Sequence, residues 1–207
     1  MKFPTKKYLS LNEFKNDYYV FLKRAFESIN NKKLNKITEL LHKTYKNKKN
    51  KILVCGNGGS ASLANHFACD HQKILYETKK IKPYLNSLSS NIALITAISN
   101  DINYQNVFAD QISQIGKKGD ILITISSSGS SKNIIKAIKT AKHMSIKTIS
   151  LTGFSGGQSK KLSDYNIHIH SYNYGIIESM HHTAMNLISQ YIKNKILNLN
   201  EIKKIKF

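Results

Sequence analysis

Short hydrophobic runs alternate with longer amphipathic segments along most of the sequence. The short runs are rich in branched residues and are bounded by turn residues, which is typical of strands buried on both faces. We expect such strands at 52–55, 84–88, 120–126 and 146–152. The segment 165–170 alternates between hydrophobic and polar residues, which favours a fifth strand at the edge of the sheet.

Between these runs, hydrophobic residues recur at helical spacing. Two helices are expected before the first strand, and their aromatic stripes indicate packing in the core or between subunits. The expected helices cover 11–29, 34–45, 92–98, 104–115, 132–143 and 175–197, with a further helix after the first strand and a lysine-rich tail at the end.

This alternation predicts a parallel sheet with helices on both faces, which is an α/β fold. We find no internal repeat and no linker in the sequence. One domain is therefore expected over residues 1–207, with N-terminal helices at about 8–48 and a long C-terminal helix at about 175–197.

The stretch 51–70 combines the features of an anion site. Its strand is followed by a turn with Gly56, Gly58 and Gly59, and Ser60 is predicted to be the N-cap of the next helix. The first N–H groups of a helix lack partners within the helix and carry partial positive charge. Because glycines let the backbone approach a ligand closely, the turn predicts a phosphate site.

The stretch 125–131, ISSSGSS, repeats this arrangement at the end of another strand. Hydroxyl groups beside a helix that begins at Ser131 or Lys132 are suited to hold phosphate oxygens. Parallel strands bring both turns to the same edge of the sheet, where open α/β sheets bind ligands. The pair of turns therefore predicts a phosphorylated substrate.

Two other kinds of ligand are disfavoured by the sequence. Gly56, Gly58 and Ala61 match a dinucleotide fingerprint, but Glu77 lies in a lysine-rich connection instead of closing a second strand, so no nucleotide cofactor is expected. The net charge of +20 comes mostly from lysines spread along the chain. It favours the steering of an anionic substrate rather than specific nucleic-acid binding.

The cellular setting follows from cysteine usage and hydropathy. Cys55 and Cys69 have no spacing typical of a disulfide framework, which predicts reduced, buried thiols. No hydrophobic run is long enough for a membrane helix, and the N-terminus lacks the pattern of a signal peptide. A cytoplasmic protein without membrane contact is expected.

The segments CGNGGSA and ISSSGSS, together with AISND and LTGFSGG, resemble the sugar isomerase (SIS) fold and, within it, the phosphoheptose isomerases. The resemblance implies a three-layer sandwich with a flavodoxin-like parallel sheet, and a homotetramer with active sites between subunits. It also implies one zinc ion per subunit. The implied reaction converts sedoheptulose 7-phosphate to D-glycero-D-manno-heptose 7-phosphate through an enediol, for lipopolysaccharide or capsule synthesis.

The same resemblance assigns the substrate-binding residues position by position. The two turns and the Asn-Asp pair of the AISND segment match the family, with Ser127 at a position where threonine is usual. The implied substrate ligands are Asn57, Gly58, Gly59, Ser60, Asn100, Asp101, Ser126, Ser127, Ser128, Ser131 and Glu178.

The acid–base and metal positions depart further from the family. His66 and Asp70 lie four residues apart on one helix face, with Asp70 in place of a glutamate. Glu178 and Asn186 occupy the positions of a glutamine and a histidine, and His181 or His182 is left to supply the imidazole. Leu63 and Gly175 replace two aspartates. The resulting expectation is Asp70, Glu178 and His182 for catalysis, and His66, Asp70, Glu178 and His182 for the metal.

Three functions agree with this sequence. The first is the heptose phosphate isomerase, in which Asp70 or Glu178 is the base. The second is an isomerase of another phosphosugar, which would account for the changed positions Leu63, Gly175 and Asn186. The third is a non-catalytic phosphosugar-binding protein, in which the binding turns persist while the acid–base residues have changed.

Overall fold

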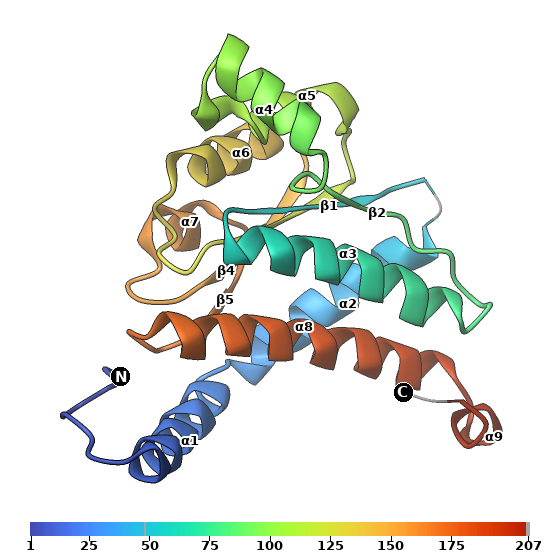
Figure 1. Cartoon of the computed structure of the whole chain (residues 1–207). Helices are drawn as coiled ribbons and strands as arrows, with labels where there is room; N and C mark the ends of the chain where they lie inside the picture. The colour runs from blue at the N-terminus through green and yellow to red at the C-terminus, as the bar shows by residue number, and fades with distance from the viewer. Residues whose placement is uncertain (48, 206–207) are drawn as a thin grey trace.

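The computed structural model describes residues 1–47 and 49–205 and contains one five-stranded parallel sheet (Figure 1). The strands follow the order β2-β1-β3-β4-β5, which is the flavodoxin-like order. This confirms the predicted fold class and the edge position of the last strand. The strands are β1 (Ile52–Gly56), β2 (Leu85–Ser87), β3 (Ile121–Ile125), β4 (Lys147–Thr152) and β5 (Tyr165–His168).

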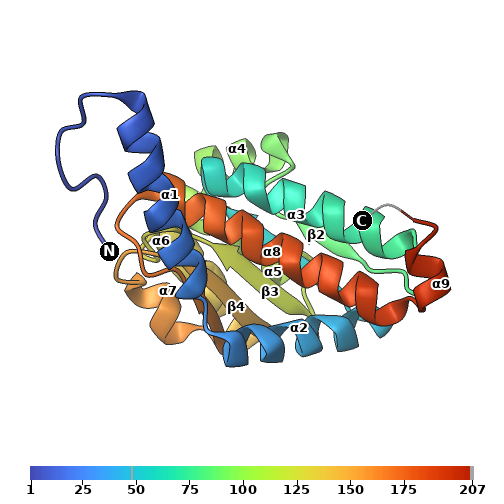
Figure 2. The ribbon, with the colours of Figure 1, turned by 90° about the horizontal axis from the view of Figure 1, so that it is seen from below.

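Helices cover both faces of the sheet and make a three-layer sandwich (Figures 1 and 2). One face carries α1 (Leu11–Glu27), α2 (Asn31–Lys46), α3 (Gly59–Tyr76) and α8 (Tyr174–Ile196). The other carries α4 (Ile92–Asp101), α5 (Ala109–Ile115) and α6 (Lys132–His143). The remaining helices are the 3-10 helix η1 (Tyr104–Asn106), α7 (Gly157–Leu162) and α9 (Leu199–Ile202).

The central strands are hydrophobic throughout because their side chains enter two separate cores. Ile52 and Val54 pack with α3 and α8, whereas Leu53 and Cys55 pack with α4, α5 and α6. All four side chains are fully buried. This alternation is the physical reason why an uninterrupted hydrophobic run forms a central strand of a covered sheet.

Several local predictions were wrong. The helix expected at 104–115 is divided into η1 and α5, because Val107 and Phe108 turn inward between them and are buried. Ser60 is not the N-cap, because Gly58 with its positive φ takes that position and α3 begins at Gly59, two residues earlier than a cap at Ser60 implies. Cys69 is exposed, because α3 turns Ala64, Phe67 and His71 inward. The short helices α7 and α9 were not predicted.

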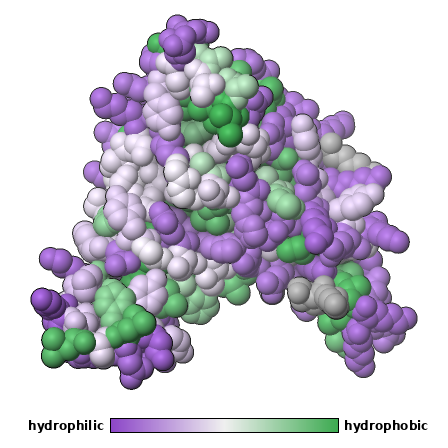
Figure 3. All heavy atoms as spheres, viewed as in Figure 1, coloured by the Kyte–Doolittle hydropathy of each residue, from purple (hydrophilic) through white to green (hydrophobic). Residues whose placement is uncertain are grey.

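The surface is mostly hydrophilic on the face that Figure 3 shows, and hydrophobic residues gather at the end of α1. Leu9 and Leu11 are 94% and 81% exposed, and Tyr19 on the same helix is also exposed. Among the described residues, no helix has both the length and the hydrophobicity that a membrane span needs.

The serine-rich loop after β3 is fixed by close backbone packing against the turn between β4 and α7. Gly129 has a φ of +64°, and a β-carbon there would overlap the carbonyl of Gly156. The carbonyl of Gly129 accepts a hydrogen bond from the Ser159 amide at 2.9 Å, and that of Ser127 accepts one from the Gly153 amide at 2.8 Å. Only glycine fits at position 129.

We therefore expect Gly129→Ala to lower the free energy of unfolding by roughly 2 kcal/mol or more, through backbone strain and steric overlap. Urea unfolding at neutral pH measures this change. Gly175→Ala is the matched control, because a β-carbon there would meet no atom closer than 3.4 Å. Equal stability of the two variants would contradict the packing described for Gly129.

The imidazole of His71 joins three helices inside the core. Its Nδ1 lies 2.6 Å from the Tyr45 hydroxyl of α2, and its Nε2 lies 3.1 Å from the Met185 carbonyl of α8. A neutral ring satisfies both contacts if Nε2 donates and Nδ1 accepts. Burial lowers the pKa of His71 to about 3, although the hydrogen bond to Met185 acts in the opposite direction.

Because the unfolded chain binds a proton at this ring near pH 6.5 and the folded chain does not, stability should fall as pH drops below 6.5. His71 should contribute about 1.4 kcal/mol per pH unit between pH 6.0 and 5.0. His71→Gln keeps a donor and an acceptor without titrating, so its unfolding free energy should depend less steeply on pH in urea titrations. The exposed His143→Gln serves as the control. A slope unchanged in His71→Gln would refute this assignment.

Candidate active site

A pocket of about 150 Å³ opens at the carboxyl ends of β1 and β3. Three segments form it: the turn after β1, the loop after β3 and the first turns of α8. Its lining residues are Asn57, Ser60, Ile125, Ser126, Ser127, Ser128, Ser131, Tyr174 and Glu178. The structure therefore brings the two predicted phosphate turns together, as the parallel sheet requires.

Two helices begin at this pocket without a side-chain cap. The N-cap residues Gly58 of α3 and Ser131 of α6 make no capping hydrogen bond through a side chain. The other four helices of ten or more residues are all capped, by Ser10, Asn30, Asn91 and Asn173. Because uncapped helix N-termini attract anions, the two at the pocket form a site suited to phosphate.

The serine loop offers one buried hydroxyl that has no hydrogen-bond partner among the described residues. Ser126 Oγ accepts a hydrogen bond from the Gly129 amide at 3.2 Å, and Ser128 Oγ accepts one from the Ser130 amide at 3.3 Å. Ser127 is only 5% exposed, and its Oγ has no hydrogen-bond partner among the described residues. A buried hydroxyl without a partner is costly, so a ligand oxygen is its natural partner.

Glu178 supplies a carboxylate to the same pocket. Its Oε2 lies 3.4 Å from the place that a β-carbon of Gly59 would occupy, so the carboxylate is in contact with the start of α3. The absence of a side chain at Gly59 permits this approach. A substrate held by the serines is therefore next to a carboxylate from α8.

His66, Asp70 and His182 form a second polar cluster farther along the seam between α3 and α8. The Nε2 of His66 lies 2.9 Å from Oδ2 of Asp70, and the rings of His66 and His182 meet edge to face at 4.7 Å. His66 is seven residues beyond Gly59, which is about 10 Å along the helix axis. The cluster and the phosphate turns thus lie at different places on one seam, and Figure 2 shows the two helices side by side.

The predicted zinc ligands are not brought together as a set within one chain. Glu178 lines the pocket, whereas His66, Asp70 and His182 lie farther along the seam. In the part of the chain that the structure describes, no three His, Cys, Asp or Glu side chains are arranged to hold a metal ion. Zinc binding therefore stays a prediction.

The two neighbouring histidines of α8 have different surroundings. His181 is fully buried, and this burial lowers its pKa to about 4. Neither of its ring nitrogens has a hydrogen-bond partner among the described residues. His182 is half-buried and contacts His66. Of the two, His182 is the one that lies in the polar seam.

Asn100 and Asp101 do not line the pocket of their own chain. Both are exposed at the end of α4, where Asn100 Nδ2 donates to Asp101 Oδ1 at 2.9 Å. By contrast, Tyr174 lines the pocket although the sequence analysis did not predict it. Its ring packs against Phe154 at 4.7 Å, and a single aromatic residue before a helix carries no pattern that could have revealed this role.

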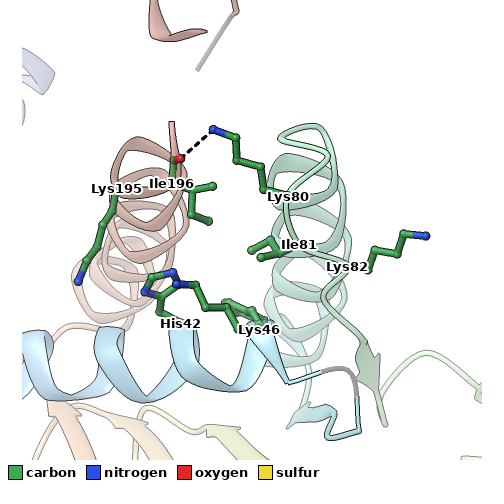
Figure 4. Close-up of a pocket in the computed structure, with 8 residues that line it drawn as sticks. His42, Lys46, Lys80, Ile81, Lys82, Lys195 and Ile196 are labelled. Atoms are coloured by element: carbon green, nitrogen blue, oxygen red, sulfur yellow. Dashed lines mark hydrogen bonds between the residues drawn. The ribbon is translucent and has the colours of Figure 1, made fainter. Parts of the chain in front are cut away.

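A larger pocket of about 470 Å³ lies at the opposite end of the molecule, before the amino ends of β1 and β2. Figure 4 shows Ile81 and Ile196 facing each other across it, while Lys82 and Lys195 extend away from the space between them. The ammonium group of Lys80 donates to the Ile196 carbonyl at 3.1 Å. Because its polar groups do not converge, we do not place the active site there.

Comparison with known proteins finds the SIS domain over residues 13–153. The phosphoheptose isomerase of Helicobacter pylori strain P12 is 40% identical over 180 residues, which is 86% of this chain and 92% of the relative. The solved phosphoheptose isomerase of Neisseria gonorrhoeae has a TM-score of 0.80 at 29% identity, covering 89% of this chain and 100% of its own. The solved phosphoheptose isomerase of Francisella tularensis has a TM-score of 0.81 at 27% identity, covering 90% of this chain and 100% of its own.

The unused hydroxyl of Ser127 generates a binding prediction. Ser127→Ala should raise the dissociation constant for inorganic phosphate by about ten- to hundredfold, the loss expected for one hydrogen bond to a charged ligand. NMR titration with phosphate measures it. Ser130→Ala, an exposed serine of the same loop that does not line the pocket, should bind phosphate like the unchanged chain. Equal affinity in both variants would exclude Ser127 as a phosphate ligand.

Proposed function

The chain belongs to the SIS domain family and, within it, to the phosphoheptose isomerases, and on this basis we propose that it converts sedoheptulose 7-phosphate to D-glycero-D-manno-heptose 7-phosphate. One observation carries the proposal beyond family membership: two uncapped helix N-termini and the unpartnered Ser127 hydroxyl meet in one pocket beside a carboxylate. The product class is the precursor of heptose in lipopolysaccharide or capsule.

In this proposal the phosphate binds at the serine loop and at the starts of α3 and α6. The net charge of +20 favours the approach of an anionic substrate. The phosphate is on C7, whereas the reacting carbons are C1 and C2, so the acid–base groups have to lie a full sugar length from the phosphate. The seam between α3 and α8 supplies polar side chains in that direction, first Glu178 and then the His66, Asp70 and His182 cluster.

We assign the proton transfer to this cluster. Asp70 removes a proton from the carbon next to the carbonyl, giving an enediol, and returns it to the neighbouring carbon. The contact with His66 holds the Asp70 carboxylate in place, and His182 exchanges protons with the substrate oxygens. Glu178 binds sugar hydroxyl groups between the phosphate and the reacting carbons. No step is derived through zinc, because one chain does not assemble the predicted ligand set.

We further propose that the enzyme is a homotetramer in the cytoplasm. Leu9 just before α1 and Leu11 and Tyr19 on the helix are exposed hydrophobic side chains, and in this proposal a second copy of the chain covers them. Asn100 and Asp101, outside the pocket of their own chain, then act in a site shared between subunits. Size-exclusion chromatography with light scattering tests the assembly.

The function is tested by NMR of the purified protein with sedoheptulose 7-phosphate in heavy water. We expect an aldoheptose phosphate with deuterium at C2, because the proton that the base takes from C1 exchanges with the solvent before the base returns a proton to C2. Asp70→Asn should lower kcat by at least about 100-fold through loss of the base. It should still bind phosphate, since the serine loop is unchanged.

Asp110→Asn on α5, which lines no part of the pocket, is the matched control and should keep full activity. Near-normal turnover in Asp70→Asn would exclude Asp70 as the base. Substrate binding without any product in the unchanged chain would contradict the heptose isomerase and would call for a screen of other sugar phosphates. A repeat with a chelator shows whether the reaction needs a metal.

A further inference from the structure

The side chain of Asn57, expected from the sequence to be a substrate ligand, is occupied within its own chain. Its Nδ2 donates to Asn133 Oδ1 at 2.9 Å, and its Oδ1 accepts from Asn133 Nδ2 at 2.8 Å. The Tyr104 hydroxyl donates to the same Oδ1 at 2.9 Å. Both lone pairs of this oxygen are thereby used, so it has none left for a substrate hydroxyl.

These hydrogen bonds tie together three segments that are distant in the sequence. Asn57 lies in the turn between β1 and α3, Asn133 in the first turn of α6, and Tyr104 in η1. Asn133 is only 2% exposed, and its Oδ1 also accepts from the Ile134 amide at 2.9 Å. A buried amide with satisfied hydrogen bonds specifies one arrangement of its neighbours.

The Asn57 main chain leads directly into the start of α3. Its carbonyl accepts hydrogen bonds from the Ser60 amide at 2.9 Å and from the Ala61 amide at 3.3 Å. Gly58 follows with a φ of +53°, a conformation that needs support from its surroundings. The amide pair therefore fixes the turn before α3 relative to the first turn of α6.

We propose that Asn133 and Tyr104 are positioning residues of the phosphate site. They hold Asn57 so that the uncapped starts of α3 and α6 face the same phosphate. This inference rests on the proposed function for its kinetic readout, but not for its binding readout. Asn133 should affect phosphate affinity more than Tyr104 does. It makes two hydrogen bonds to Asn57 and is buried, whereas Tyr104 makes one and is 53% exposed.

The variant Asn133→Asp separates positioning from mere stability. An ionised aspartate keeps an oxygen that accepts from Asn57 Nδ2. Its second oxygen replaces the Asn133 Nδ2 donor, and this oxygen repels Asn57 Oδ1. A protonated aspartate donates again, so the defect should be repaired at low pH. A residue that only stabilises the fold would not give phosphate affinity this dependence on pH.

The experiment measures the dissociation constant of inorganic phosphate by NMR, and KM and kcat for sedoheptulose 7-phosphate, at pH 8.0 and 5.5. At pH 8.0 we expect Asn133→Asp to raise the dissociation constant and KM by about tenfold or more, and Tyr104→Phe by about threefold, with a smaller change in kcat. Relative to the unchanged chain at each pH, the defect of Asn133→Asp should shrink at pH 5.5.

Asn103→Asp adds the same charge at an exposed residue just before η1 that makes no capping hydrogen bond, and Tyr84→Phe removes an exposed hydroxyl elsewhere, so both should match the unchanged chain. Unchanged phosphate affinity and KM in Asn133→Asp and Tyr104→Phe would overturn the proposal, as would a defect of the same size at both pH values. If the unchanged chain binds phosphate but converts no sugar phosphate, the proposed function fails while the dissociation constants still decide the positioning role.

Discussion

Two helix N-termini without side-chain caps, brought together at the carboxyl ends of adjacent parallel strands, are the feature on which the rest of the site depends. β1 and β3 are neighbours in the sheet, so α3 and α6 begin side by side. The other helices of ten or more residues that the structure describes have a serine or asparagine cap, whereas the N-cap residues of these two make no side-chain capping bond. Helix starts of this kind are suited to an anion.

The parallel packing of α3 and α8 places further polar side chains beyond this pocket. The contacts follow the same direction along both helices, with Gly59 beside Glu178, His66 beside His182, and Glu77 paired with Lys193. In the core, the imidazole of His71 on α3 hydrogen-bonds to Tyr45 of α2 and to the Met185 carbonyl of α8, and so links the three helices. In the proposed mechanism, a sugar anchored at the start of the seam extends along these polar side chains.

The features that could be predicted from the sequence are those determined by residues close together in the chain. The two-sided burial of the central strands and the glycine and serine turns are visible as patterns, and so the fold class and the meeting of the two turns in one pocket were predicted correctly. Phosphate binding by these turns stays a prediction. Contacts between distant segments leave no such pattern. In the sequence, nothing distinguishes the buried Asn133 from an exposed polar residue of a helix, and Tyr174 belongs to no recognisable motif. The break between η1 and α5 depends on the burial of Val107 and Phe108 in the core.

A crystal structure of the Asp70→Asn variant with sedoheptulose 7-phosphate tests the central claim most directly. We predict that the phosphate lies between the starts of α3 and α6, within hydrogen-bond distance of Ser127 Oγ, with C1 and C2 directed along the seam toward His66 and His182. A phosphate bound elsewhere, for example at the lysine-lined pocket beside Ile81 and Ile196, would contradict the account. So would a sugar that points away from the seam.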